Sequence, residues 1–508
     1  MKADSKVRIC VPLCEKTFDA VEAVLPKATA VADLIEIRLD CLDPLELEKA
    51  PTRLASISKK ISVPLILTLR PAEEGGNREL GQDERRSFWQ RIQVEDALLD
   101  IELNLLRAMD MGSIDWNRMI CSHHDFSGVT PSVNESYTEM VKTPARILKL
   151  AVHANDVTDC LALFDLLKRA RADRREVIAI AMGTAGITTR VLGPLYGSYL
   201  TYGSLSSERG TAPGQITARE LRNTYRIDSI DQQTQVVGLV GLPTAHSISP
   251  QIHNSAFESS GVNAVYLPFE VCDLAAFMKR MVHPRSRELD WQLRGLSVTA
   301  PHKLAVMDYL DWIDPEAKEI GAVNTIVVTE EGLRGYNTDA AGFLSPLLER
   351  LQSIAGLNCA VIGAGGAART AAWTLKRQGA KVKIFARRAD QARALAESLN
   401  VSWGDLQAVH FGDFDLVVNT TPLGTSGQLQ NQTVLTSDQL HGARLLYDLV
   451  YNPRETQLMR EAKAAGCDAL GGLAMLVAQA TEQFRLWTGR PAPLATMRRA
   501  AEKALASE

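Results

Sequence analysis

Residues 359–388 read CAVIGAGGAARTAAWTLKRQGAKVKIFARR. The apolar run 359–362 predicts a strand, the glycines after it a tight turn, residues 368–378 a helix, and residues 381–386 a second strand. Glycine in such a turn lets the backbone approach a pyrophosphate at a helix N-terminus. Ala367 and Ala368 stand at the late positions of the usual glycine pattern, so the order strand–turn–helix–strand is the stronger evidence. We predict a Rossmann-like dinucleotide-binding domain with a turn made of Gly363, Ala364, Gly365, Gly366 and Ala367.

The end of the second strand indicates the cofactor. NAD-binding proteins usually have an acidic residue there for the ribose hydroxyls. Here Arg387 and Arg388 follow the strand, and the first carboxylate is Asp390. Two guanidinium groups suit a ribose 2′-phosphate, although two solvated surface arginines are the alternative. NADP is therefore the expected cofactor.

The first 228 residues alternate short apolar runs with helical stretches such as 84–98 and 157–170. The runs are 7–13, 34–39, 64–69, 98–103, 119–123, 146–152, 177–182 and 199–205. Eight such units predict a (β/α)₈ TIM barrel, whose reacting groups lie at the C-terminal strand ends. The polar residues near those ends are Glu36, Arg38, Arg70, Glu102, His124 and Lys149.

A polar stretch at 228–235 interrupts this pattern, and we predict a domain boundary there. Further strands are predicted at 236–242, 264–269, 295–299 and 323–328. The fold class is thus α/β, with a barrel followed by a two-domain unit that contains the Rossmann-like domain.

Composition excludes several classes of protein. The 508 residues are 46% hydrophobic and 23% charged, which favours several packed domains over a disordered chain. A net charge of −4 argues against nucleic acid as a partner. No apolar run reaches 18 residues and no leader-like segment opens the chain, so we expect no membrane partner and a cytoplasmic location.

The eight cysteines are scattered, and neither they nor the nine histidines show metal-ligand spacing. We expect reduced, mostly buried thiols and no metal site.

The two halves resemble two enzyme families. The first half has Glu36-Ile-Arg38, Thr68-Leu-Arg70, Glu74-Gly-Gly, His124-Asp-Phe, Lys149 and Thr211-Ala-Pro-Gly-Gln215, and resembles the type I 3-dehydroquinate dehydratases. The second half has Ser247-Ile-Ser249-Pro, Thr299-Ala-Pro-His-Lys303, Gly321-Ala-Val-Asn324-Thr, Asn337-Thr-Asp339 and Met475-Leu-Val-Ala-Gln479-Ala, and resembles the shikimate dehydrogenases. The order matches known dehydratase–dehydrogenase fusions.

The resemblance implies dehydration of 3-dehydroquinate to 3-dehydroshikimate, and reduction of that product to shikimate with NADPH. It implies four segments: a dehydratase barrel (1–228), a substrate-binding domain (236–339), an NADP-binding domain (340–455) and C-terminal helices that return to the substrate domain (456–508). The sequence does not determine the oligomeric state, and a monomer is favoured over a homodimer.

In the first half, loss of a proton beside a ketone needs a better electron sink, which a lysine imine supplies. Lys149 falls on the family's Schiff-base position in an apolar strand, where burial would lower its pKa; a lysine that extends its amine to solvent is the alternative. His124 falls on the family's general acid/base, and an imidazole titrates near working pH. Glu74 would orient or tune His124, Arg190 would bind the substrate carboxylate, and His123 would only pack or be solvated. The implied remaining contacts are Glu36, Arg38, Arg70, Thr211 (serine in most of the family) and Gln215.

In the second half, the oxygen that gains charge as hydride arrives needs a proton or a cation nearby. Lys303 and Asp339 match the family's catalytic pair. Ser247 and Ser249 match its carboxylate-binding serines, and Leu449 (often methionine) and Gly472 would flank the nicotinamide. The other implied substrate contacts are Thr299, Asn324, Tyr451 and Gln479. Gln391 replaces a frequent arginine, which predicts weaker NADP binding unless Arg388 compensates.

Two alternatives remain open from the sequence. One is a quinate-preferring dehydrogenase half that uses NAD, which Arg387 and Arg388 argue against. The other is a metabolite-sensing protein that has lost catalysis. Such a protein should also have lost Lys149, His124, Lys303 or Asp339, and all four are present.

Overall fold

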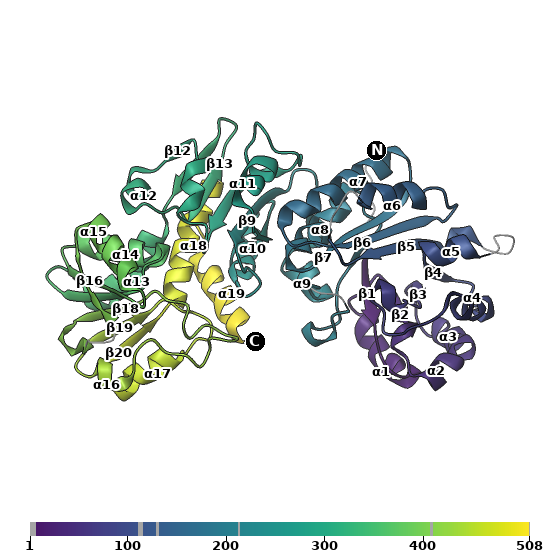
Figure 1. Cartoon of the computed structure of the whole chain (residues 1–508), viewed down its shortest axis with the longest axis horizontal. Coiled ribbons are helices and arrows are strands. Elements are labelled where there is room, and N and C mark those ends of the chain that lie inside the picture. Colours follow the sequence, from purple (N-terminus) through teal and green to yellow (C-terminus); the bar gives the residue numbers. More distant parts are fainter. Residues whose placement is uncertain (1–6, 110–114, 129–131, 212–213, 407–409, 507–508) are drawn as a thin grey trace.

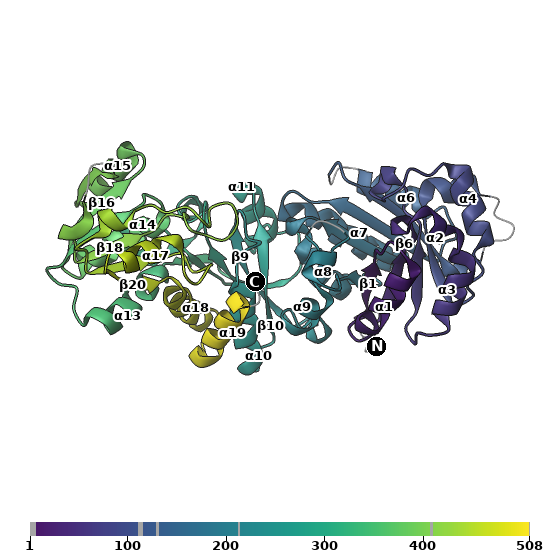
Figure 2. The same ribbon diagram turned by 90° about the horizontal axis from the view of Figure 1, so that it is seen from below.

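The computed structural model describes residues 7–109, 115–128, 132–211, 214–406 and 410–506. Three sheets follow one another along the chain, and the molecule is elongated (Figures 1 and 2). The barrel lies at one end, the second sheet in the middle and the third sheet at the other end.

The first sheet is the predicted barrel. Its order is β7-β6-β5-β4-β3-β2-β1-β8, with every pair parallel. The strands are β1 (Ile9–Leu13), β2 (Leu34–Arg38), β3 (Leu65–Thr68), β4 (Ala97–Glu102), β5 (Met119–Asp125), β6 (Ile147–His153), β7 (Glu176–Met182) and β8 (Thr201–Tyr202). A parallel bridge joins Val177 of β7 to Ser198, three residues before β8, so the barrel is nearly closed. All eight predicted strands are confirmed.

The barrel strands are buried on both faces, which explains their continuous apolar runs. Cys10, Leu34, Ile66, Ile120 and Ile147 form part of a cluster inside the barrel. Helices cover the outside: α1 (Phe18–Thr29), α2 (Pro44–Glu48), α3 (Ala50–Ser58), α4 (Gln82–Arg91), α5 (Leu103–Ala108), α6 (Ser132–Met140), α7 (Cys160–Ala172), α8 (Ile187–Leu192) and α9 (Ala218–Asn223).

The second sheet has the order β10-β9-β11-β13-β14-β12. Its strands are β9 (Gln235–Gly241), β10 (Ala264–Glu270), β11 (Gln292–Val298), β12 (Trp312–Ile313), β13 (Thr325–Val328) and β14 (Leu333–Tyr336). β9, β10 and β11 are parallel, whereas β13 is antiparallel to both β11 and β14. Its helices are α10 (Ser249–Ser259), α11 (Leu274–Phe277) and α12 (Pro315–Ile320).

The third sheet is the predicted Rossmann-like unit. All its strands are parallel, in the order β17-β16-β15-β18-β19-β20. They are β15 (Asn358–Ile362), β16 (Lys381–Ala386), β17 (Ser402–Asp405), β18 (Leu416–Asn419), β19 (Leu445–Asp448) and β20 (Asp468–Gly471). Counted from β15, this is the 3-2-1-4-5-6 order of doubly wound dinucleotide-binding folds.

The helices around the third sheet connect it to the second. They are α13 (Asp339–Leu351), α14 (Gly366–Arg377), α15 (Ala389–Leu399), α16 (Ser437–Leu440), α17 (Gln457–Ala464), α18 (Leu473–Thr488) and α19 (Leu494–Ala506). α18 packs on α13, and α19 packs on α10. Because β20 pairs with β19, the third sheet continues to Gly471, which corrects the predicted start of the C-terminal helices at 456.

The barrel and the second sheet share one buried core. A single cluster of buried apolar residues contains Val191 of α8 together with Val265 and Leu267 of β10. β10 is an edge strand of its sheet, and α8 contacts it. The polar stretch at 228–235 therefore connects two units that pack directly against each other.

The cysteines differ from the prediction in one pair. Cys14 and Cys41 form a disulfide with their Cα atoms 5.3 Å apart. β1 and β2 are neighbouring parallel strands, so the residues just beyond their C-terminal ends lie close together. The other six cysteines are free, and all but Cys272 are buried.

No helix in the described ranges is long and apolar enough to span a membrane.

Candidate active sites

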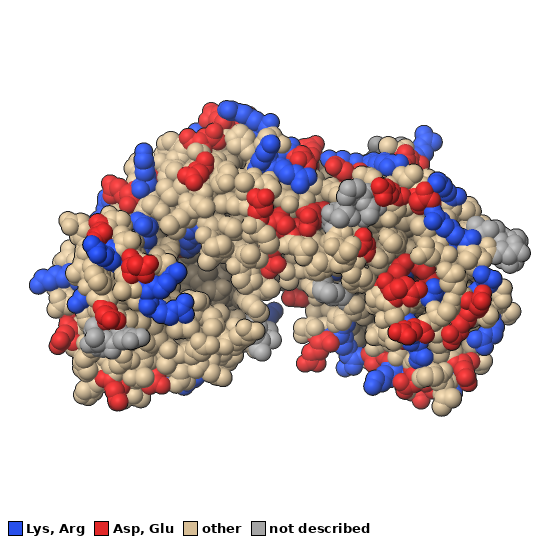
Figure 3. Space-filling model, viewed as in Figure 1, with Lys and Arg blue, Asp and Glu red and all other residues tan. Residues whose placement is uncertain are grey.

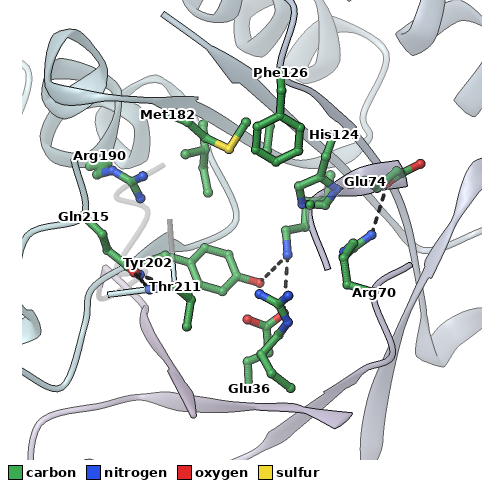
Figure 4. Close-up of a pocket in the computed structure, with 15 residues that line it drawn as sticks. Glu36, Arg70, Glu74, His124, Phe126, Met182, Arg190, Tyr202, Thr211 and Gln215 are labelled. Carbon is green, nitrogen blue, oxygen red and sulfur yellow. Dashed lines mark hydrogen bonds and ion pairs between the residues drawn. The ribbon is translucent and has the colours of Figure 1, made fainter. Parts of the chain in front are cut away.

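A pocket opens at the C-terminal ends of the barrel strands (Figure 4). All nine residues predicted for the first site line it: Glu36, Arg38, Arg70, Glu74, His124, Lys149, Arg190, Thr211 and Gln215. Figure 4 shows Arg190 and Gln215 on one side and His124, Glu74 and Arg70 on the other. The structure thus brings together residues that are up to 179 positions apart, from Glu36 to Gln215.

Lys149 lies deep in this pocket. It is the third residue of β6, and 5% of its surface is exposed. Its Nζ is 2.8 Å from Asp100 Oδ2, 3.0 Å from Tyr202 Oη and 3.5 Å from Glu36 Oε1. The predicted burial in an apolar strand is confirmed, and the buried amine is paired with carboxylates.

His124 shares a carboxylate with its neighbour. Its Nδ1 is 3.1 Å from Glu74 Oε2, and His123 Nδ1 is 3.7 Å from Glu74 Oε1. Burial and the charge of Arg70 lower the pKa of His124 to about 3, so its imidazole is neutral at working pH. The expectation that this imidazole titrates near working pH is therefore corrected.

Two opposing effects act on the pKa of Glu74. Burial opposes its ionisation, but hydrogen bonds from His123 and His124 and the charge of Arg70 outweigh burial and lower its pKa to about 2. The hydrogen bond to Glu74 raises the pKa of His123. His123, expected only to pack or be solvated, is thus part of this network.

Two arginines hold carboxylates at the rim of the barrel. Arg70 donates to Asp100 Oδ1 at 2.6 Å, to Ser122 Oγ at 2.8 Å and to Glu74 Oε2 at 3.3 Å. Arg38 forms a two-pronged pair with Asp40, both bonds 2.9 Å long. Both guanidinium groups therefore brace the site, whatever their contact with substrate.

Arg190 differs from these two arginines. It is 1% exposed, and among the described residues neither its Nε nor its Nη2 has a hydrogen-bond partner. Burial alone lowers its pKa to about 10. Its guanidinium points into the pocket (Figure 4). A buried cation without a partner is costly, which indicates that an anionic ligand completes it.

The loop that carries Thr211 and Gln215 closes one side of the pocket. Gln215 Oε1 accepts from the Thr211 backbone N–H at 2.8 Å. A Cβ on Gly214 would stand 2.2 Å from the Gly183 carbonyl carbon, so the loop backbone lies directly on the turn after β7. Residues 212 and 213 of the predicted motif lie outside the described residues.

Several residues in or next to the pocket were missed from the sequence. Asp100 pairs with both Arg70 and Lys149, and the charges of these two residues, against the effect of burial, lower its pKa well below its usual range. Tyr202, Phe126 and Met182 also line the pocket. Side chains along the predicted strand 98–103 alternate between its two faces. Asp100 is two residues before Glu102 and therefore lies on the same face, which could have identified it. Glu102 itself pairs with Arg85 of α4, outside the pocket lining.

A second polar site lies between the second and third sheets. Lys303 Nζ is 2.5 Å from Asp339 Oδ2, and Asp339 is the first residue of α13. A Cβ on Gly366 would lie 3.2 Å from Lys303 Cδ. The glycine turn and the Lys303–Asp339 pair are therefore adjacent.

The other predicted residues of this site support it from several elements. Asn324 Nδ2 donates to Thr338 Oγ1 at 3.0 Å and lies 3.5 Å from Gln479 Oε1, which connects the second sheet to α18. Ser247 Oγ accepts from the Ser249 N–H at 3.2 Å at the start of α10.

Four further predicted contacts lie on neighbouring elements. Thr299 directly follows β11 and packs against Gly241. Tyr451 and Gly472 line one cleft beside α18, and the Leu449 carbonyl packs against Gly472.

The glycine turn fits a dinucleotide. Gly363 has φ +126°, and a Cβ there would meet Thr420 Oγ1. Gly365 precedes α14 and has open space where its Cβ would be, so the first N–H groups of α14 can be approached. Arg387 and Arg388 are exposed at the end of β16, and Gln391 follows on α15. Figure 3 shows a hollow in this half of the molecule with Lys and Arg side chains on its rim.

Within the described ranges, no three His, Cys, Asp or Glu side chains are placed to hold a metal ion.

Three family profiles match the chain. They are described as Type I 3-dehydroquinase (residues 9–232), Shikimate dehydrogenase substrate binding domain (239–326) and Shikimate 5'-dehydrogenase C-terminal domain (472–502). The chain is 35% identical to the chloroplastic bifunctional 3-dehydroquinate dehydratase/shikimate dehydrogenase of Arabidopsis thaliana, over 96% of this chain and 82% of that protein. It is 44% identical to the shikimate dehydrogenase (NADP(+)) of Oleidesulfovibrio alaskensis, over 54% of this chain and 96% of that protein.

A crystal structure of a shikimate dehydrogenase in complex with NADP+ covers 54% of this chain and 97% of its own, with 35% identity and a TM-score of 0.51. Fold and sites thus define a barrel lyase joined to a dinucleotide-dependent dehydrogenase. The chain belongs to the family of bifunctional 3-dehydroquinate dehydratase/shikimate dehydrogenases of the shikimate pathway.

Proposed function

We propose that Lys149 is the nucleophile of the dehydratase reaction. Its amine attacks the ketone of 3-dehydroquinate, and loss of water gives an imine. The carboxylates of Asp100 and Glu36, 2.8 and 3.5 Å from Nζ, stabilise positive charge at this nitrogen. A protonated imine withdraws electrons from the neighbouring carbon far better than a ketone does, so the proton on that carbon can be removed.

His124 is proposed to move that proton. Its imidazole is neutral because burial lowers its pKa to about 3, so it can accept a proton without first losing one. Glu74, 3.1 Å from Nδ1, orients the ring and would stabilise the imidazolium that forms. The same imidazolium then donates a proton to the leaving hydroxyl.

The environment of Arg190 is the observation that carries this proposal. A buried guanidinium with unsatisfied N–H groups faces the same pocket as Lys149, and a two-pronged pair with a carboxylate would satisfy it. The substrate of this reaction carries one carboxylate, a ketone and a hydroxyl. Arg190, Lys149 and His124 supply a matching group for each of the three. Glu36, Arg38, Arg70, Thr211 and Gln215 are proposed to hold the remaining hydroxyls and close the pocket.

The second site is proposed to reduce 3-dehydroshikimate. NADPH, when bound, supplies the hydride to the ring ketone. Lys303 and Asp339 lie where the carbonyl oxygen would gain charge, and their 2.5 Å contact keeps the ammonium directed at that position. Ser247 and Ser249 are proposed to bind the substrate carboxylate, and Thr299, Asn324, Tyr451 and Gln479 its ring hydroxyls.

The cofactor-binding residues are proposed from the same geometry. The turn from Gly363 to Ala367 would hold the pyrophosphate at the start of α14, and Leu449 and Gly472 would flank the nicotinamide. Arg387 and Arg388 would bind the 2′-phosphate, and they support NADP over NAD.

We also propose a division into a barrel (1–228), a substrate domain (236–339) and a nucleotide domain, the last extended to Gly471 because of β20. A cytoplasmic monomer completes the proposal. The Arabidopsis relative is named as a chloroplast protein. Cell fractionation and light scattering with size exclusion test these two points.

The decisive experiment is a coupled assay with 3-dehydroquinate and NADPH. The expected result is cofactor oxidation with shikimate as the product. NADH used in preference, with quinate oxidised in reverse, would instead indicate the quinate-preferring alternative. Absence of both reactions in folded protein would indicate the metabolite-sensing one.

A second experiment tests the imine alone. Borohydride added together with 3-dehydroquinate should reduce the imine and leave the substrate covalently attached to Lys149. Peptide mass mapping identifies the modified residue. An adduct on another lysine, or no adduct, would refute the assignment.

A further inference from the structure

Glu270 connects the two units of the molecule. It is the last residue of β10, and 9% of its surface is exposed. Its Oε2 accepts a hydrogen bond from Thr184 Oγ1 of the barrel, and its Oε1 accepts the backbone N–H of Thr244 at 3.2 Å. One buried carboxylate therefore holds a residue from each side of the interface.

On the barrel side, Thr184 lies two residues after Met182, which lines the dehydratase pocket. It begins the short 3₁₀ helix η6 (Thr184–Gly186), which leads directly into α8 and Arg190. Gly214, in the loop with Thr211 and Gln215, packs on Gly183 and on the Thr184 backbone N, with its Cβ position 2.6 Å from that nitrogen. Thr184 is thus linked to α8 along the chain and to Gly214 by close packing.

On the dehydrogenase side, Thr244 begins the turn that carries the two serines. Its carbonyl accepts the Ser247 N–H at 3.1 Å, and Ser247 Oγ accepts the Ser249 N–H. A bond from Glu270 to Thr244 thus fixes the start of the proposed carboxylate-binding turn.

The residues that follow Glu270 make the same kind of double contact. We call residues 270–273 the bridge segment. The carbonyl of Val271 accepts from His302 Nε2 at 2.8 Å, and His302 directly precedes Lys303. The backbone N–H groups of Cys272 and Asp273 donate to Asp156 Oδ2 of the barrel, at 2.6 and 3.2 Å. Asp156 follows β6, the strand that carries Lys149.

We propose that Glu270 is a positioning residue for both reactions and that, through the bridge segment, occupation of one site changes substrate affinity at the other. This proposal rests on the proposed site residues. A substrate carboxylate held by Arg190 restrains α8 and the preceding η6, hence Thr184, Glu270 and the serine turn. Such coupling is reciprocal, so a ligand in the dehydrogenase site affects the dehydratase site by the same factor.

Thr184→Val tests the bridge from the barrel side, because it removes the hydroxyl and keeps the shape. The readout is the initial rate of shikimate oxidation with NADP+, a reaction that does not use the dehydratase site. We expect KM for shikimate to rise about threefold or more, with kcat within about twofold of the parent. Thr184→Ser, which restores the hydroxyl, should restore the parent KM.

Tyr196→Phe is the matched control. Tyr196 Oη also donates across the interface, to the Asp290 carbonyl at 2.7 Å, but Asp290 is in neither proposed site. Its KM for shikimate should equal that of the parent. An unchanged KM in Thr184→Val, or an equal rise in Tyr196→Phe, would overturn the proposal.

Glu270 itself gives a second, independent measurement. Glu270→Ala should raise KM for both 3-dehydroquinate and shikimate, whereas Glu270→Gln, which can still bond to Thr184 and Thr244, should keep most of the parent affinity. If Glu270→Ala does not fold, the KM values of Thr184→Val and Thr184→Ser test the proposal. A parent that oxidises no shikimate overturns the proposed function and the bridge together, whereas an active parent with unchanged variants overturns the bridge alone.

Discussion

Asp100 Oδ2 lies 2.8 Å from Lys149 Nζ, and its other oxygen, Oδ1, lies 2.6 Å from Arg70 Nη2. One carboxylate thus pairs with two buried cations, both of which line the dehydratase pocket. Because Asp100 is 1% exposed, neither ion pair is screened by solvent.

Asp100→Asn should therefore destabilise the protein strongly. The substitution keeps the shape but leaves Glu74, at 3.3 Å, as the carboxylate that pairs with Arg70, and Glu36, at 3.5 Å, as the carboxylate that pairs with Lys149. The neutral partners Ser122 and Tyr202 stay in place. Loss of one partner from a buried pair costs about 3–5 kcal/mol. Because each cation keeps one carboxylate, we expect a loss at the lower end of this range. Denaturant unfolding measures the change. The control Asp83→Asn, whose side chain is 94% exposed, should stay within about 0.5 kcal/mol of the parent.

Glu74→Gln should separate the two adjacent histidines. The hydrogen bond to Glu74 is the largest cause of the raised pKa of His123, so that pKa should fall toward its ordinary value. The pKa of His124 should stay low, because burial and Arg70 dominate it. NMR titration of the imidazole signals, assigned with His123→Gln, checks both. A rise in the pKa of His124 would contradict the structure.

The same substitution should have a pH-dependent effect on stability. A raised pKa means that folded His123 holds its proton more tightly than the unfolded chain does. The stabilisation is fully present below the unfolded pKa of about 6.5 and is lost as pH rises through the folded value. Glu74 is ionised across this range. Glu74→Gln should therefore destabilise more at pH 6 than at pH 9, as measured by chemical denaturation at each pH.

Arg190→Met should make the free protein more stable and a worse dehydratase. It removes a buried cation whose Nε and Nη2 have no partner among the described residues, and apolar replacement of buried charge can gain about 1–4 kcal/mol. It also removes the proposed carboxylate ligand, so KM for 3-dehydroquinate should rise about tenfold or more. Thermal unfolding without substrate and initial rates check the two halves. A less stable variant would show that Arg190 already has a partner in the free protein.

Replacing both Arg387 and Arg388 with glutamine should weaken NADPH and leave NADH nearly unchanged. Only NADPH carries the 2′-phosphate, and each lost charge-assisted contact costs about 1.5–3 kcal/mol, hence about tenfold or more in affinity. Fluorescence titration with each cofactor measures this. Equal weakening of NADH binding would mean that the two arginines contact the pyrophosphate or contribute to folding.

The two chemistries should be separable by substitutions away from the bridge segment. Lys149→Ala should lower dehydratase activity by orders of magnitude and leave reduction of supplied 3-dehydroshikimate near the parent rate, because Lys149 contacts only barrel residues. Asp339→Ala should give the reverse. A mixture of the two variants should convert 3-dehydroquinate fully through released intermediate. Loss of reduction in folded Lys149→Ala would contradict this separation.

The sequence predicted the barrel well because each strand is a short apolar run buried on both faces. It predicted the pocket residues through family motifs, yet missed Asp100, since alternation does not show how deep in the barrel an acidic side chain lies. The imidazole of His124 was expected to titrate near working pH because its burial depends on distant residues such as Arg70. The Cys14–Cys41 disulfide was missed although both residues follow neighbouring predicted strands.

The bridge segment could not be predicted at all. Residues 228–235 look like a linker, and nothing local to Glu270 indicates a partner in Thr184, 86 positions earlier. Such contacts follow from how two folded units dock.

The position of β10 has a consequence for anyone who would divide this gene in two. β10 is the open edge of the second sheet, and the barrel covers it: α8 packs along it, and Arg226 Nη2 donates to the carbonyl of Ala264 at its start. A dehydrogenase half expressed from residue 235 onward would present this seven-residue, largely apolar strand uncovered. Exposed edges of that kind recruit strands from other chains, so the isolated half should self-associate or aggregate. In the intact chain the barrel therefore shields the edge strand of the enzyme that follows it.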